Sequence, residues 1–165
     1  MKIFKNILLT IAAALVILLI AALFMNKDYG VEREVVILES KDTVFAYIKN
    51  LKNQDDFSSW SSKDPNMIKE YVGEDGQVGF ISKWDSEDPD VGRGEQEIVS
   101  VEEGKRIDYE LRFYEPFEST EKAYMIVEAI DDTSTKVIWG FKGRFDYPQN
   151  LFLLFVDFEE AIGND

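Results

Sequence analysis

The sequence contains no cysteine and no histidine among its 165 residues. The absence of cysteine excludes disulfide scaffolds, thiolate metal sites and thiol nucleophiles. The absence of histidine excludes imidazole ligands and any triad that needs an imidazole base. Chemistry is therefore left to carboxylates, lysine, tyrosine, serine and threonine. We expect no cofactor and no metal ion, and the composition identifies no catalytic residue.

Positive charge is also scarce. The sequence has 18 lysine and arginine residues and 32 aspartate and glutamate residues, which gives a formal charge of −14 and a pI near 4.4. Such a chain repels phosphate backbones, so nucleic acid is not an expected partner. The hydrophobic fraction of 45% is nevertheless sufficient for a core, and the length suits one domain of about 100 to 150 residues with an appendage.

One long uncharged run, Ile7–Met25, lies near the N-terminus, and Thr10 is its only hydroxyl residue. As a helix, its 19 residues at about 1.5 Å each cover about 28 Å, close to the roughly 30 Å of a bilayer core. The alternative is a cleaved signal peptide, whose apolar region usually has about 7 to 15 residues and ends in a small-x-small site. Bulky Leu23, Phe24 and Met25 close the run here, which favours a retained anchor.

The charges beside this run predict its orientation. Lys2 and Lys5 precede it, and Lys27 and Asp28 follow it, so the excess of positive charge favours a cytoplasmic N-terminus. We therefore expect a single-pass protein of the cell membrane whose soluble domain lies on the extracytoplasmic side. An anchored domain of this kind without cysteine is typical of bacteria.

Two units follow from this division, an anchor with short flanks over residues 1–27 and one domain over residues 28–165. The domain holds 15 bases and 32 acids, and it is mostly composed of segments with the period-2 alternation of strands. Ser40 is placed to cap a short helix, and Leu51–Trp60 forms a second amphipathic stretch. The seven predicted strands are Val31–Leu38, Ile68–Val72, Val78–Trp84, Gly94–Val101, Ile107–Phe113, Lys122–Ile130 and Lys136–Lys142.

The last predicted element is a helix over Asn150–Ile162, because Leu151, Leu154, Phe155 and Phe158 recur at the spacing of one helical face. The sequence ends soon afterwards, so we expect this helix to be truncated. The order of elements predicts an α+β fold. In this fold a curved antiparallel sheet of about seven strands packs one face against the last helix.

Alternation along the strands selects the residues that face this helix, since charged Asp108, Glu110 and Arg112 alternate with apolar neighbours. The inward rows are Ile107, Tyr109, Leu111 and Phe113; Ala123, Met125, Val127 and Ala129; and Val137, Trp139 and Phe141. An aromatic lining of this kind suits an apolar ligand, although a filled core uses the same residues. The predicted ligand-binding residues are Trp84, Tyr109, Leu111, Phe113, Met125, Trp139, Phe141 and Phe158.

Several short motifs follow one another in an order that is similar to that of a known family. They are Phe57-Ser58-Ser59-Trp60, Asp64-Pro65, Tyr71-Val72-Gly73, Val78-Gly79, Trp84 and Val91-Gly92-Arg93-Gly94. From residue 29 onwards the chain resembles polyketide cyclase/dehydrase-like members of the START-like superfamily (SRPBCC). This resemblance implies a helix-grip fold, in which about seven strands wrap a long C-terminal helix around a hydrophobic cavity. It implies ligand or lipid binding more strongly than catalysis, and no catalytic residue is carried over by motif.

The densest acidic cluster, Asp85, Glu87, Asp88 and Asp90, offers the oxygen ligands that calcium binds. It lacks the spacing and the glycine of an EF-hand loop, and Pro89 lies within it. We therefore interpret it as a solvated hairpin turn rather than a metal site.

Three functions remain open at this stage. The favoured one is a membrane-anchored domain that binds a hydrophobic or amphipathic small molecule or lipid in an internal cavity. The second is an enzyme of the polyketide cyclase/dehydrase type, which predicts an ionisable residue with a shifted pKa in that cavity. The third is an acidic protein-interaction module without a ligand, which predicts a filled interior and an exposed patch for a protein partner of unspecified identity.

Overall fold

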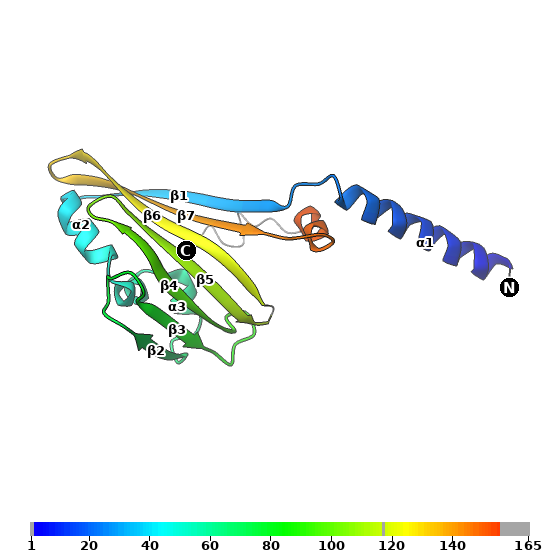
Figure 1. The fold of residues 1–165 in the computed structure, drawn as a ribbon, viewed down its shortest axis with the longest axis horizontal. Helices are drawn as coiled ribbons and strands as arrows, with labels where there is room; N and C mark the ends of the chain where they lie inside the picture. Colours follow the sequence, from blue (N-terminus) through cyan, green and yellow to red (C-terminus); the bar gives the residue numbers. More distant parts are fainter. Residues whose placement is uncertain (1, 117, 156–165) are drawn as a thin grey trace.

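The computed structural model describes residues 2–116 and 118–155. Its first element is helix α1 (Lys2–Ala22), which projects from the rest of the protein (Figure 1). Ala22, at the end of α1, is its only buried residue. The helix is long and apolar enough to cross a membrane, a property that a signal sequence shares. The predicted helical run Ile7–Met25 is confirmed as far as Ala22, whereas residues 23–25 lie outside the helix.

The strands form one antiparallel sheet in the order β1-β7-β6-β5-β4-β3-β2. Strands β2 to β7 follow one another in chain order, whereas β1 crosses the domain to pair with β7 (Figure 1). This confirms the predicted seven-stranded sheet. The strands are β1 (Asp28–Ile37), β2 (Ile68–Val72), β3 (Ile81–Asp85), β4 (Arg93–Glu102), β5 (Arg106–Glu115), β6 (Ser119–Asp131) and β7 (Ser134–Arg144).

One strand begins later than the sequence predicts. The predicted strand over Val78–Trp84 is wrong at its start, because β3 begins only at Ile81. Val78 is 60% exposed, and Gly79 has a φ of +88°, which lies outside the β region. Regular pairing therefore starts after this glycine.

Three short helices lie between β1 and β2, namely α2 (Lys41–Ile48), the 3-10 helix η1 (Leu51–Asp56) and α3 (Ser59–Lys63). Ser40 caps α2, because its side-chain oxygen accepts a hydrogen bond from the Thr43 amide at 3.4 Å. The predicted continuous stretch over Leu51–Trp60 is wrong in detail. It breaks at Phe57, whose φ of −135° is incompatible with a helix, and the chain then restarts as α3.

The core lies between these helices and one face of the sheet, which is called the concave face below (Figure 1). From the helices come Val44, Phe45, Ile48 and Leu51. The sheet contributes Val31, Phe80, Ile98, Ile107, Tyr109, Ala123, Met125, Val127, Val137 and Phe141. The predicted inward rows are confirmed except at Ala129. This residue is exposed because the end of the β6–β7 hairpin extends past α2.

The described part of the C-terminus differs from the predicted helix over Asn150–Ile162. The chain forms a 3-10 helix, η2 (Gln149–Leu154), beside the end of α1 rather than across the concave face (Figure 1). Asn150 is fully buried, and its Nδ2 donates to the backbone carbonyl of Ala22 at 2.7 Å. A carbonyl in the last turn of α1 thereby gains a partner that the helix itself does not supply. The rest of the predicted helix, including Phe158, lies outside the described residues.

Candidate ligand-binding site

Within residues 2–116 and 118–155, the concave face is covered unevenly. Helices α2 and η1 fill the end where Ile107 and Val127 lie, and both of these residues are buried. The other end holds Tyr29 of β1, Glu121 of β6 and Phe113 of β5, and α2 lies at the opposite end of these strands in Figure 1. A ligand would therefore find apolar surface at the second end, and packed core at the first.

The seven described residues of the predicted site all lie on this face, because strand alternation sends them to the same side. Tyr109, Met125 and Phe141 are buried, at 1%, 6% and 5% exposure. Leu111, Phe113 and Trp139 are only partly buried against the same cluster, and Trp84 reaches it through Phe113. The predicted site is therefore divided between buried core residues and residues that keep accessible surface.

Three aromatic rings meet at the partly covered end. The Phe113 ring makes edge contacts with Trp84 and with Trp60 of α3, at centroid distances of 5.7 and 6.4 Å. Gly94 lies opposite Trp84 on the neighbouring strand, and a Cβ there would come within 2.5 Å of the indole. The absent side chain is thus what allows the indole to lie over the strand. The sequence identified Trp60 only as part of a short motif, since nothing in the local pattern places α3 above β5.

Two polar atoms on this face are buried without a hydrogen-bond partner among the described residues, Trp84 Nε1 and the Tyr109 hydroxyl. The amide of Gln54 approaches the hydroxyl without completing a hydrogen bond, and burial raises the pKa of Tyr109 above its ordinary value. Buried polar atoms without partners are uncommon in folded proteins, because each loses its hydrogen bonds to water and gains none in the protein.

One carboxyl group also belongs to the concave face. Glu121 of β6 is only 4% exposed, and it accepts hydrogen bonds from the Tyr29 hydroxyl at 3.3 Å and the Arg144 amide at 3.2 Å. Burial raises the pKa of Glu121 above its ordinary value, while these hydrogen bonds oppose the shift. Sequence reasoning missed this residue, although the row of Ala123 and Met125 reaches it when extended by one step.

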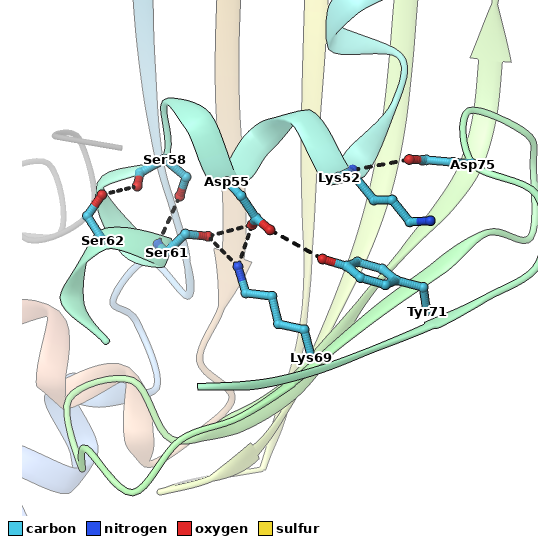
Figure 2. A network of polar contacts seen from close by, with 8 residues as sticks. All are labelled: Lys52, Asp55, Ser58, Ser61, Ser62, Lys69, Tyr71 and Asp75. Atoms are coloured by element: carbon cyan, nitrogen blue, oxygen red, sulfur yellow. Dashed lines mark hydrogen bonds and ion pairs between the residues drawn. The ribbon is translucent and has the colours of Figure 1, made fainter. Parts of the chain in front are cut away.

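A polar network fastens the short helices to the edge of the sheet (Figure 2). Asp55 of η1 accepts hydrogen bonds from the Tyr71 hydroxyl of β2 and the Ser61 hydroxyl of α3, each at 3.2 Å, and it pairs with Lys69 of β2. Ser58 caps α3 through the Ser61 amide at 3.2 Å. These contacts hold α3 in position, and with it the Trp60 ring above Phe113, so we assign them a structural role.

A separate surface cleft of about 430 Å³ lies between α2 and the β4–β5 turn. Its lining is mostly polar, and the ion pair between Lys49 and Glu103 lies within it. It contains none of the predicted ligand-binding residues, so it is distinct from the concave face. The acidic cluster around Asp88 is a turn, in which the Asp90 amide donates to Asp88 at 2.9 Å. Within the described ranges, no group of three acidic residues is arranged to hold a metal ion.

No protein-family model and no curated protein matches the sequence, but solved structures do. A truncated norcoclaurine synthase from Thalictrum flavum matches with a TM-score of 0.64 and 10% identity, over 84% of this chain and 89% of that chain. Ara h 8.0201 matches with a TM-score of 0.55 and 17% identity, over 84% and 86% of the two chains. A Thermobifida fusca protein solved by NMR matches with a TM-score of 0.52 and 18% identity, over 82% and 83%.

Identities at this level show a shared fold and nothing finer. The curved antiparallel sheet, the short helices between its first two strands and these structural neighbours together define a helix-grip fold. The predicted fold class is therefore confirmed. One of the neighbours, norcoclaurine synthase, has been solved in complex with dopamine and hydroxybenzaldehyde.

Proposed function

We propose that this protein is a membrane-anchored, polyketide cyclase/dehydrase-like START domain whose concave face binds a hydrophobic or amphipathic small molecule or a lipid. The observation that carries the proposal is the uneven cover of that face. Leu111, Phe113 and Trp139 keep accessible surface beside a packed core, which is the arrangement that apolar ligand sites use.

The anchor completes this proposal. Helix α1 is taken as a retained single span of the cell membrane, with the lysines before it on the cytoplasmic side and the domain on the extracytoplasmic side. The strongly acidic domain is then attached to the bilayer by α1 and not by surface charge. A bacterial origin and a lipid ligand belong to the same proposal.

The direct test is native mass spectrometry with lipid extraction on the full chain released from phosphatidylcholine nanodiscs. We expect a reproducible co-purifying apolar molecule. Saturable quenching of tryptophan fluorescence by dibromostearic acid should follow, because Trp84 and Trp139 lie on the binding face. An empty protein that shows neither saturable quenching nor thermal stabilisation by apolar ligands contradicts the proposal, and it favours the acidic interaction module.

Two neighbouring residues of β5 provide a matched pair of variants, because they point to opposite faces of the sheet. Phe113→Ala removes a ring from the concave face and is expected to weaken quencher binding about tenfold, equivalent to about 1.4 kcal/mol. Tyr114→Ala removes a ring that is 40% exposed, and it should leave the affinity unchanged. Equal effects of the two variants would place the ligand elsewhere.

Glu121 favours a second candidate function, an enzyme of the polyketide cyclase/dehydrase type. A buried carboxyl group with a raised pKa is suited to proton transfer near neutral pH, and the Tyr29 hydroxyl orients it. In a screen of polyketide-like substrates on the full chain, Glu121→Gln should abolish turnover while quencher binding persists. Turnover that survives this substitution would exclude Glu121 as the catalytic acid or base.

A further inference from the structure

The end of α1 and helix η2 are joined by a buried hydrogen bond. Asn150 donates to the carbonyl of Ala22 at 2.7 Å, and both residues are fully buried. The neighbouring bond from the Phe145 amide to the carbonyl of Lys27, at 2.9 Å, continues the β1–β7 pairing and fixes the chain segments that lead into this contact. The position of α1 therefore determines the position of η2.

The length of α1 determines where this junction lies relative to a bilayer. Its 21 residues at about 1.5 Å each extend about 32 Å, which matches the roughly 30 Å of hydrocarbon in a membrane. If α1 spans the membrane, Ala22 lies at the boundary between hydrocarbon and headgroups. Helix η2 is one hydrogen bond away from Ala22, so it lies at the same boundary in either orientation of α1.

Several exposed side chains at this junction are large and apolar. In η2 and just after it, Phe152, Leu154 and Phe155 are 58%, 55% and 78% exposed. Leu23 and Phe24, directly after α1, are 57% and 86% exposed. The residues from 147 to 155 carry no charge, although the domain as a whole carries 47 charged residues. Such a patch is unfavourable in water and suits the interface of a bilayer.

We propose that η2 is a membrane-interfacial element. Phe152, Leu154 and Phe155 would insert at the headgroup–acyl boundary of the bilayer that α1 spans, and they would hold this end of the domain against the membrane. The inference rests on the membrane anchoring in the proposed function. The bilayer is favoured over a protein partner because the patch is continuous with the apolar end of the domain's own span.

This placement has a consequence for the candidate site. Phe152 contacts the Phe145 ring at a centroid distance of 6.2 Å, and Phe145 stacks on Tyr29 at 5.0 Å. Tyr29 in turn donates to Glu121 on the concave face. A row of aromatic rings thus joins the interfacial patch to the partly covered end of the site, so an apolar ligand would exchange with the membrane at that end.

The absence of cysteine makes the test direct, because any cysteine introduced is the only one. We would label full-chain Phe155→Cys with an environment-sensitive fluorophore, reconstitute it in phosphatidylcholine vesicles, and measure quenching by doxyl-labelled phosphatidylcholine. Leu38→Cys is a matched control, because Leu38 is 81% exposed and follows β1 at the opposite end of the sheet (Figure 1). A second pair is Leu154→Cys and Ile130→Cys, with 55% and 57% exposure.

We expect blue-shifted emission and strong quenching at positions 155 and 154, and unquenched emission at positions 38 and 130. A label at Ile11→Cys, within α1, separates the two proposals. If the α1 label is quenched and the η2 labels behave like their controls, the interfacial role of η2 is refuted while the anchor stands. If the α1 label is not quenched either, both the anchor and the interfacial role are refuted.

Discussion

The face of the sheet opposite the concave face, called the convex face, carries charge pairs between neighbouring strands. Replacement of Arg112 by methionine tests whether these pairs stabilise the protein. The Arg112 guanidinium bonds Glu95 and Glu97 of β4 at 2.6 Å each, and it also pairs with Glu110 of its own strand. The side chain of Arg112 is 24% exposed, and those of the three glutamates are 14%, 27% and 35% exposed. Arg112→Met leaves three carboxylates close together without a cation.

The magnitude follows from this partial exposure. A surface ion pair contributes about 0.2–1 kcal/mol, whereas a hydrogen bond to a charged group contributes about 1.5–3 kcal/mol when it is shielded from water. Three pairs at intermediate exposure give a loss of about 2–3 kcal/mol. Hydrogen bonding to Glu97 and Glu95 raises the pKa of Arg112 above its ordinary value, so the guanidinium stays charged and this stabilisation is present throughout the neutral range.

Urea unfolding of the full chain in neutral detergent micelles measures this loss. Tryptophan fluorescence reports on the domain alone, because Trp60, Trp84 and Trp139 all lie outside α1. With a slope of about 1–3 kcal/mol per molar urea, Arg112→Met should lower the midpoint by about 0.7–3 M. The deficit should shrink in molar salt, which screens the exposed carboxylates.

A double variant completes the test. Adding Glu97→Gln to Arg112→Met should restore part of the loss, because it removes one of the three repelling charges, whereas Glu97→Gln alone should destabilise the protein. An unchanged midpoint in Arg112→Met would refute the reasoning, since it would mean that water already screens the cluster.

Three further outcomes are expected from single substitutions of the full chain. Gly94→Ala places a Cβ 2.5 Å from the Trp84 indole, so it should cost about 1–3 kcal/mol in urea unfolding and change the near-UV circular dichroism. Gly92→Ala should cost more, because its φ is +62° and its Cβ would overlap a backbone carbonyl. Gly104→Ala, with a φ of +68° and open space around it, should cost only about 1 kcal/mol, and equal losses would contradict the overlap. Burial raises the pKa of Glu121 above its ordinary value of 4.5, so ionisation of this carboxyl group weakens the folded state. The Tm of Glu121→Gln minus the Tm of the unmodified protein should therefore increase from pH 4 to pH 8. A Tm difference that does not change with pH would contradict the burial of this carboxyl group.

Much of the fold was predictable because each strand has one solvent-exposed face and one buried face. The alternation of Ile107, Tyr109 and Leu111 with charged residues specifies a half-buried strand, and a register error would turn every apolar residue to water. The same logic identified Trp139 and Phe141. It failed at Ala129, where the alternation continues but the helices no longer cover the sheet.

The candidate site was predictable only in part, because its composition depends on contacts between distant segments. Trp60 joins Phe113 only through the placement of α3, which Asp55 holds in position. Glu121 contacts the Tyr29 hydroxyl only because β1 pairs with β7 and brings Tyr29 to the concave face. Neither contact leaves a local signal in the sequence.

The sequence by itself determined the apolar helix, the antiparallel sheet and the face on which a ligand would lie, because hydrophobic run length and period-2 alternation are local consequences of burial. The tertiary structure alone decided which end of that face is filled and which stays accessible, and it decided where the C-terminal segment docks. Asn150 bonds Ala22 across a separation of 128 residues, and only the folded chain brings these two residues together.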